Sequence, residues 1–231
     1  MTNIFPDMPL YAPCIAGETF HPLTERIQEY AVSQPERLAV CDEQQHWNWQ
    51  QLAQQVNRVA NRLKAAGLKP GDKVAGLSEN SVQYLALYLG TLAAGGCMVP
   101  LSGMASGDGL ALMIEDCDAS FLFISARHLT LVTPLRPRLN KIPPHHFIGL
   151  DFSAEHWAGL EKWLADSAPT RPPCTVSFDH AFNIIYSSGT TGTPKGILHD
   201  HRFRARQIKR MSSYGLHRDT INLVSTPLYS N

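Results

Sequence analysis

Residues 48–125 alternate between helix-forming and strand-forming segments, and this alternation limits the fold more than any other feature of the sequence. Short apolar runs predict strands at 73–77, 97–101 and 120–125, and the stretches between them predict helices at 82–94 and 110–116. This βαβαβ order favours an α/β fold with a parallel sheet and helices on both faces. Ligands of such folds bind at the carboxyl ends of the strands.

The first helix of this series carries the clearest signals. Asn48 can cap it, with Gln51 three residues on as the reciprocal partner, and Gly67 followed by Pro70 ends it. Asn80 and Gln83 have the same spacing, so we expect Asn80 to cap the second helix. The apolar face of the first helix predicts core residues at Leu52, Val56, Val59, Ala60 and Leu63.

Hydroxyl residues and glycines follow a further apolar run at 182–186, which predicts a short buried strand. The residues after it are Ser187, Ser188, Gly189, Thr190, Thr191, Gly192, Thr193, Pro194, Lys195 and Gly196. Successive backbone amides in such a loop form a concave anion site, glycines let the backbone approach closely, and hydroxyls add donors. Because Lys195 adds a full positive charge, the stretch predicts a phosphate-binding loop.

Three other interpretations fit this loop less well. A Walker A loop needs a glycine before its lysine and a Ser or Thr after it, whereas Pro194 and Gly196 flank Lys195. A flexible linker rarely carries a strand in front and one lysine behind a proline. A serine hydrolase would use Ser187 or Ser188 as a nucleophile, but the G-x-S-x-G pattern is absent. Labelling of either serine by a serine-reactive probe would favour the hydrolase.

Residues 186–196 closely resemble the signature loop of the acyl-adenylate-forming superfamily, which includes acyl-CoA synthetases, peptide-synthetase adenylation domains and luciferases. Segments 47–52, 68–75, 92–101 and 226–231 resemble this family in the same order. The resemblance covers nearly the whole chain. It implies stacked, mostly parallel sheets flanked by helices, as in the N-terminal domain of these enzymes.

The resemblance also implies an activity. The complete protein is expected to be an ATP-dependent carboxylic acid:CoA ligase that forms an acyl-adenylate and pyrophosphate and then an acyl-CoA. ATP, Mg²⁺ and coenzyme A are the implied cofactors, and Lys195 and Thr191 the implied catalytic residues. Thr190 and Thr191 are expected to contact phosphate directly. The implied nucleotide-binding residues are Ser187, Ser188, Gly189, Thr190, Thr191, Gly192 and Lys195.

Tyr229, Ser230 and Asn231 are expected to begin the wall of the acyl pocket, although Tyr229 could equally be packing at a strand end. Many CoA ligases of the family carry a histidine where this chain has Ser230, so fatty, aryl and other small organic acids all stay open. A peptide-synthetase adenylation domain is the alternative. A stand-alone CoA ligase is preferred because the sequence starts at its own methionine.

Several family elements are expected beyond Asn231, namely an adenine-binding segment, an acidic magnesium ligand, a ribose-binding aspartate and a small C-terminal domain. The sequence therefore predicts an incomplete domain, with a first α/β subdomain at 1–168 and the start of a second at 169–231. We expect the isolated chain to lack ligase turnover. A non-catalytic remnant that binds phosphate or nothing is the alternative.

Composition excludes some classes of protein. A hydrophobic content of 44%, a charged content of 17% and zero formal net charge argue against disorder and against a nucleic-acid partner. The five cysteines lack C-x-x-C spacing, so neither a disulfide framework nor a zinc site is expected, and a reducing cytoplasm is the simplest setting. The N-terminus does not resemble a signal peptide.

Two local patterns have simple interpretations. The charge-free run 80–107 is divided by Gly95-Gly96 and Pro100 into pieces too short to span a membrane. The basic segment 199–210 predicts a solvated helix face, formed by Arg202, Arg206, Lys209 and Arg210. His199 and His201 alone make a weak ligand set, so no metal site is assigned.

Overall fold

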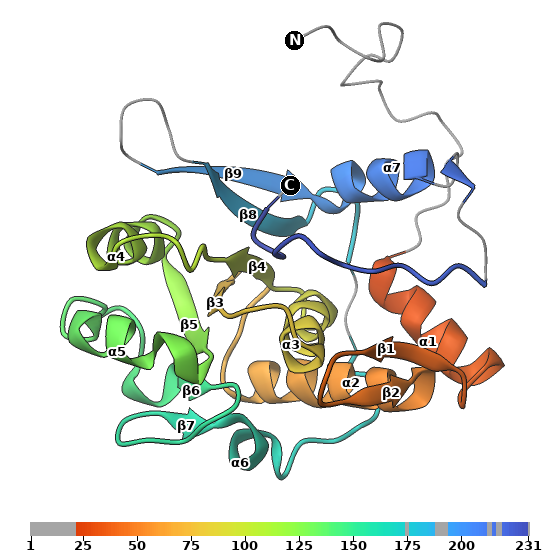
Figure 1. The fold of residues 1–231 in the computed structure, drawn as a ribbon, viewed down its shortest axis with the longest axis horizontal. Coiled ribbons are helices and arrows are strands. Elements are labelled where there is room, and N and C mark those ends of the chain that lie inside the picture. The colour runs from red at the N-terminus through yellow and green to blue at the C-terminus, as the bar shows by residue number, and fades with distance from the viewer. Residues whose placement is uncertain (1–21, 174–175, 188–193, 212–213, 216–218, 231) are drawn as a thin grey trace, which may run out of the picture.

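A computed structural model describes residues 22–173, 176–187, 194–211, 214–215 and 219–230. Its centre is a seven-stranded sheet in the order β7-β6-β5-β3-β4-β8-β9, beside a two-stranded ribbon of β1 and β2 (Figure 1). Strands β7 to β8 run parallel along this order, and β9 runs antiparallel to β8. Helices cover both faces of the sheet, which confirms the α/β prediction.

The strands are β1 Leu38–Cys41, β2 His46–Asn48, β3 Lys73–Leu77, β4 Cys97–Pro100, β5 Ala119–Ile124, β6 Phe147–Gly149, β7 Ala158–Gly159, β8 Ala181–Ser187 and β9 Lys195–Asp200. The α-helices are α1 Leu23–Ser33, α2 Trp49–Ala65, α3 Val82–Ala93, α4 Gly107–Asp116, α5 Leu129–Val132, α6 Leu160–Leu164 and α7 His201–Met211. Short 3-10 turns occur at Ala126–His128, Thr133–Leu135 and Pro144–His146.

Alternate residues of the central strands face opposite layers of helices. In β5, Phe121 and Phe123 pack with residues of α2, α3 and α6, whereas Leu122 and Ile124 pack with residues of α4 and α5. All four side chains are fully or almost fully buried. A strand buried on both faces reads as a continuous apolar run, which is why the sequence identified these strands.

The predicted cap of α2 is confirmed, whereas α3 starts at the predicted Val82 but the predicted cap residue, Asn80, is wrong. Asn48 and Gln51 form the reciprocal capping pair of α2. Helix α3 is capped instead by Ser81, whose Oγ accepts from the backbone N–H of Tyr84 at 3.1 Å. The Asn80 side chain bonds to the backbone of Thr226 and Leu228. A serine next to the asparagine competes for the cap, and the asparagine then serves a distant segment.

Most other boundaries agree with the sequence. Strand β3 has the predicted bounds, β4 ends one residue early at Pro100, and β5 and β8 each match within one residue. Helix α4 begins three residues earlier than predicted, at Gly107, because Ser106 Oγ accepts from Gly109 N at 3.2 Å. The five apolar residues of α2 predicted for the core are all buried.

One face of α2 holds the proline-rich segment 168–173. Its side chains at Asn57, Asn61 and Lys64 donate hydrogen bonds to backbone carbonyls of that segment. The bonds run from Asn57 Nδ2 to Pro169 O (2.9 Å), from Asn61 Nδ2 to Ala168 O (2.8 Å) and Thr170 O (2.7 Å), and from Lys64 Nζ to Pro173 O. The subdomain boundary expected near Pro169 stays a prediction.

The charge-free run folds into α3, which has 12 residues, and β4, which has four. Within the described ranges no helix has the length and apolar character needed to cross a membrane. Cys41, Cys97 and Cys117 are free thiols, and the last two are buried.

Candidate nucleotide-binding site

The predicted phosphate loop lies between two antiparallel strands. Strand β8 ends at Ser187 and β9 begins at Lys195, and these two residues are register partners. Both are exposed. Directly opposed side chains of an antiparallel pair have Cβ atoms about 4.5–5.5 Å apart. Ser187 and Lys195 therefore stand side by side at the base of the loop.

The loop residues Ser188, Gly189, Thr190, Thr191 and Gly192 fall outside the described residues, as does Asn231. What the structure does establish is the element on each side of the loop. A Walker A loop leads from a strand into a helix, whereas this loop leads from strand β8 into strand β9. The hairpin therefore argues against the Walker A interpretation independently of Pro194 and Gly196.

Tyr186 fixes the end of β8 to helix α4. Its hydroxyl lies 2.5 Å from Asp116 Oδ2 and 3.0 Å from Met113 O. Burial, followed by the hydrogen bond to Asp116, raises the pKa of Tyr186 well above its usual value. Gly196 stands opposite Tyr186, and an added Cβ would come within 3.2 Å of the tyrosine ring. A glycine at 196 therefore lets the two strands pack closely next to the loop.

A buried polar network joins the hairpin to the sheet and to α7. Asn183 of β8 is its centre: its Nδ2 donates to Tyr88 Oη of α3 at 2.7 Å, and its Oδ1 lies 3.0 Å from His199 Nδ1 of β9. Arg204 of α7 reaches the same Asn183 oxygen at 3.4 Å. The His199 ring stacks on Phe203 at 4.3 Å between centroids. Four elements are thus held at one point, four residues before the end of β8.

The charges in this network follow from burial. Burial is the main reason why the pKa of His199 is lowered, and the positive charge of Arg204 lowers it further. Burial raises the pKa of Tyr88 to about 12 and lowers the pKa of Arg204. His199 is therefore neutral at pH 7. Asn183 was the one feature of the sequence that could have indicated this network, because a polar residue inside a buried apolar strand needs a hydrogen-bond partner.

The two histidines of the basic segment face different partners. His199 belongs to the Asn183 network, while His201 packs edge-on against Phe182 with ring centroids 5.0 Å apart. Burial, followed by the charge of His180, lowers the pKa of His201 to about 4. In the described part of the chain, no three His, Cys, Asp or Glu side chains converge as a metal site would require.

The basic segment 199–210 forms helix α7 from His201 onward, whereas its first two residues, His199 and Asp200, end strand β9 instead, and the arginines of the helix differ in environment. Arg202 forms an ion pair with Asp179, and Arg204 reaches inward to the network. Asp200 starts the helix, because its Oδ1 accepts from Phe203 N at 2.7 Å. The predicted solvated face is exposed at Lys209 and Arg210 and partly buried nearer the helix start.

The expected acyl-pocket residues lie on a turn after Pro227. Tyr229 is half-buried, and Ser230 is exposed. The backbone N–H and the Oγ of Ser230 both donate to Pro227 O, at 3.0 and 2.7 Å. Leu228 packs against the core layer that includes α3. The turn is therefore a defined structure, anchored on the first part of the chain.

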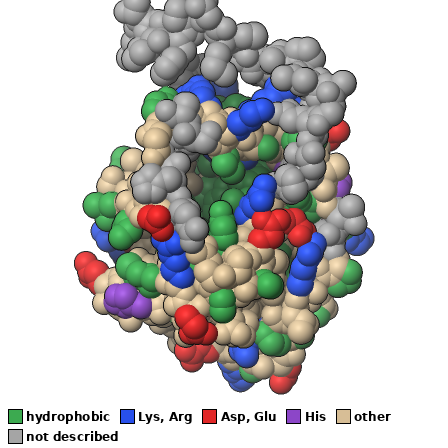
Figure 2. Space-filling model, turned by 90° about the vertical axis from the view of Figure 1, so that its right-hand side faces the viewer, with side chains coloured by type: hydrophobic (Ala, Val, Ile, Leu, Met, Phe, Trp, Pro, Cys, Tyr) green, Lys and Arg blue, Asp and Glu red, His purple; other side chains and the backbone are tan. Residues whose placement is uncertain are grey.

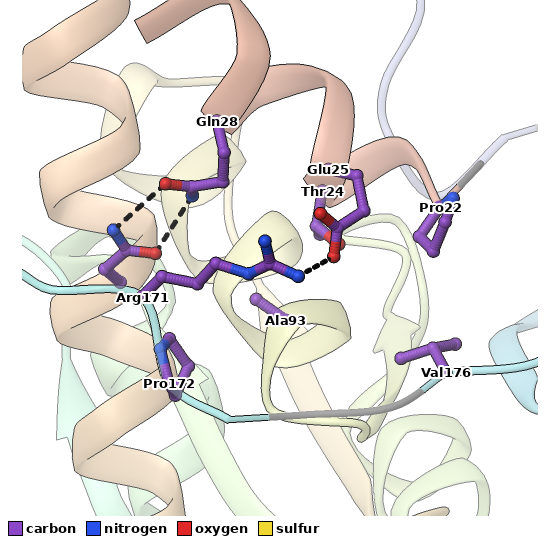
Figure 3. A pocket seen from close by; sticks show the side chains of 9 residues that line it. Pro22, Thr24, Glu25, Gln28, Ala93, Arg171, Pro172 and Val176 are labelled. Carbon is purple, nitrogen blue, oxygen red and sulfur yellow. Dashed lines mark hydrogen bonds and ion pairs between the residues drawn. The ribbon is translucent and has the colours of Figure 1, made fainter. Parts of the chain in front are cut away.

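A separate pocket lies between α1 and the segment that α2 holds (Figure 3). Within it, Arg171 forms an ion pair with Glu25, and the amide groups of Gln28 and Asn57 bond to each other at 3.0 and 3.4 Å. These polar side chains serve one another. We therefore infer that the side chains of this pocket hold segment 168–173 in place.

The mostly parallel sheet and the hairpin with a Ser/Thr/Gly/Lys sequence define the N-terminal part of an adenylate-forming enzyme. The model of the family described as "AMP-binding enzyme" matches residues 27–230, so the chain belongs to this family of adenylate-forming ligases.

Named relatives and a solved structure agree with this assignment. The fatty acid–[acyl-carrier-protein] ligase ScoC of Streptomyces coeruleorubidus is 31% identical over 78% of this chain and 33% of its own length. The 3-hydroxybenzoate/4-hydroxybenzoate–CoA ligase of Thauera aromatica is 30% identical over 72% of this chain and 32% of its own. A putative long-chain-fatty-acid CoA ligase structure from Rhodopseudomonas palustris shares the fold, with a TM-score of 0.81 and 20% identity over 90% of this chain and 52% of that one. The chain thus spans about a third of the length of these two relatives.

Proposed function

We propose that the protein containing this chain activates a carboxylic acid with ATP and transfers the acyl group to a thiol, with coenzyme A as the preferred acceptor. The carboxylate oxygen attacks the α-phosphorus, the bond to the β-phosphate breaks, and pyrophosphate leaves. The thiol sulfur then bonds to the acyl carbon and displaces AMP. Membership of the adenylate-forming family supports the class of reaction.

The observation that carries the proposal is the pairing of Ser187 with Lys195 at the base of the loop. Negative charge grows on pyrophosphate as it departs, and a fixed ammonium group with hydroxyl and amide donors stabilises that charge. We assign this role to Lys195 and Thr191, and phosphate contacts to Ser187, Ser188, Gly189, Thr190, Thr191 and Gly192. Mg²⁺ would arrive with the triphosphate, and its carboxylate ligand is expected beyond Asn231.

The acceptor and the acid are the open parts of this proposal. A 30%-identical relative is named a CoA ligase, and a 31%-identical relative is named an acyl-carrier-protein ligase. A carrier-protein thiol is therefore the second candidate acceptor, as in the peptide-synthetase alternative. A reducing cytoplasm is part of this proposal, because the five cysteines of the sequence are odd in number and lack C-x-x-C spacing.

Acid-dependent exchange of labelled pyrophosphate into ATP tests the first step. The full-length protein, screened against fatty, aryl and small organic acids, should catalyse exchange with one of these classes. Lys195→Ala should slow exchange about a hundredfold, as expected for loss of one transition-state donor. Lys162→Ala removes an exposed lysine of α6 and should leave the rate unchanged. An unchanged rate for Lys195→Ala would remove Lys195 from the mechanism.

A non-catalytic remnant is the second candidate, favoured by the apolar side chains that the C-terminal part of this chain exposes. Ile221 and Leu223 are 96% and 88% exposed. Figure 2 shows hydrophobic side chains in a hollow on one face of the molecule. We expect the purified 231 residues to form no acyl-CoA. Turnover by this chain alone would contradict that expectation.

A further inference from the structure

Asn80 joins two parts of the chain that are far apart in sequence. It lies shortly after β3, and its hydrogen-bond partners lie 146 and 148 residues further along the chain. Nδ2 donates to Thr226 O at 2.8 Å, and Oδ1 accepts from Leu228 N at 3.0 Å. These two backbone groups lie on either side of Pro227, which has no N–H of its own.

This geometry is specific for a side-chain amide. One amide group donates and accepts at once, so it can bond to a carbonyl and to an N–H two residues apart, as a residue of a neighbouring parallel strand does. Serine offers one hydroxyl in place of the separate N–H donor and C=O acceptor of an amide. Aspartate at neutral pH has no donor for Thr226 O. The helix cap, in contrast, needs only an acceptor, and Ser81 supplies it.

The other end of the same turn is fixed by its own residues. Pro227 O accepts from both the N–H and the Oγ of Ser230. Together with the two bonds of Asn80, Thr226 O, Pro227 O and Leu228 N are all hydrogen-bonded. The direction in which Tyr229 leaves the backbone is thereby set from the connection between β3 and α3.

We propose that Asn80 is a positioning residue, which orients the turn bearing Tyr229 and Ser230 and thereby sets the acid selectivity of the ligase. This inference rests on the proposed function. Asn80 acts through the backbone of the turn and does not itself contact the acid or ATP. Because Asn80 and Thr226 are exposed, their bond adds little to global stability, and the effect of losing it is local.

Hydrogen exchange of the Leu228 amide in the 231-residue chain tests the contact itself. Asn80→Ala should speed exchange at Leu228 about tenfold, because one net hydrogen bond of about 1.4 kcal/mol corresponds to a tenfold change. Asn61→Ala is the matched control: it removes an exposed asparagine amide that bonds two carbonyls of a different segment. Unchanged exchange at Leu228 in Asn80→Ala would overturn the proposal.

Steady-state kinetics of the full-length protein test the role. Asn80→Ala should raise KM for the acid several-fold and alter the ranking of acids, while KM for ATP and the unfolding midpoint stay unchanged. Equal loss for acid and ATP would show a merely structural role and overturn the proposal, as would unaltered acid kinetics with faster Leu228 exchange. Absence of adenylation in the unmutated protein would instead overturn the proposed function, whatever Asn80 does.

Discussion

The central strands β3–β5 and the C-terminal hairpin with its following segment differ in how much of their apolar surface is covered. The side chains of Val74, Val99 and Phe123 are completely buried. In β9, Ile197 and Leu198 are 45% and 60% exposed, and Ile221 further on is almost fully exposed. The first region has a buried core, whereas the second leaves large apolar side chains exposed.

The two regions are stabilised by different kinds of contact. Packing of the central sheet is determined by apolar contacts on its two faces. The hairpin carries the loop, and its strands are held by the burial of Phe182 and Ile185 and by polar contacts at Tyr186 and in the Asn183 network. Three changes can break or sharpen this comparison.

The largest effect is expected in the central sheet. Phe123 is fully buried and its ring meets Trp163 edge-on, with centroids 5.3 Å apart. Phe123→Ala should lower the free energy of unfolding by about 3–5 kcal/mol, because it leaves a cavity in a packed core. Ile221→Ala, in the exposed segment, should change it by less than about 0.5 kcal/mol. Urea unfolding of both variants measures the contrast, and equal losses would contradict it.

A pH effect should come from the start of α7. His201 is 4% exposed, and its pKa is lowered from 6.5 to about 4. The unfolded chain therefore binds a proton that the folded chain refuses between pH 6.5 and 4, so stability falls as pH falls through this window. The loss from this residue alone reaches up to about 3 kcal/mol near pH 4.

Unfolding free energies measured from pH 7 to 4 check this expectation. His201→Gln should flatten the pH slope without abolishing it, because His146 and His199 also have lowered pKa values. The exposed His156 provides the control, and His156→Gln should keep the slope of the unmutated chain. A slope that is the same in both variants would mean that His201 does not cause it.

The smallest of the three effects concerns Asn183. Asn183→Ala removes the hydrogen-bond partner of Tyr88 Oη and of His199 Nδ1, and both of these atoms belong to a buried network. This should cost about 1–3 kcal/mol of stability, the range for a buried polar group that loses its partner. In the full-length protein the same change should slow pyrophosphate exchange, because β8 and β9 hold Lys195. Normal exchange together with reduced stability would confine the network to a structural role.

The sequence predicted the central sheet well because its strands are apolar on both faces and its helices have ordinary start and stop signals. It could not predict which of two adjacent residues caps α3, since Asn80 and Ser81 both suit a cap and the choice depends on Thr226 and Leu228. Strand β9 was not predicted from the sequence. Its apolar and polar residues do not alternate in the way typical of a strand, and four of its six positions are exposed.

The chemistry assigned to the candidate site stays a prediction, and the structure adds contacts around it that the sequence did not indicate. The loop sequence and Lys195 could be recognised from residue types alone, and the structure adds that Ser187 and Lys195 are paired. The contact of Tyr186 with Asp116 and the network around Asn183 could not be read from spacing. Each joins residues about 70 to 95 positions apart, whose meeting depends on the packing of the whole sheet.

The bonds from α2 to segment 168–173 limit how this chain can vary. That segment carries the polypeptide from β7, at one edge of the sheet, past four strands to β8 near the other. Asn57, Asn61 and Lys64 follow one another at intervals of four and three residues along α2, so they offer a row of donors with a set spacing. An exposed, proline-rich connection normally accepts insertions, but an extra residue here would shift every carbonyl away from its donor. Insertions and deletions in sequences related to this one should therefore occur outside segment 168–173.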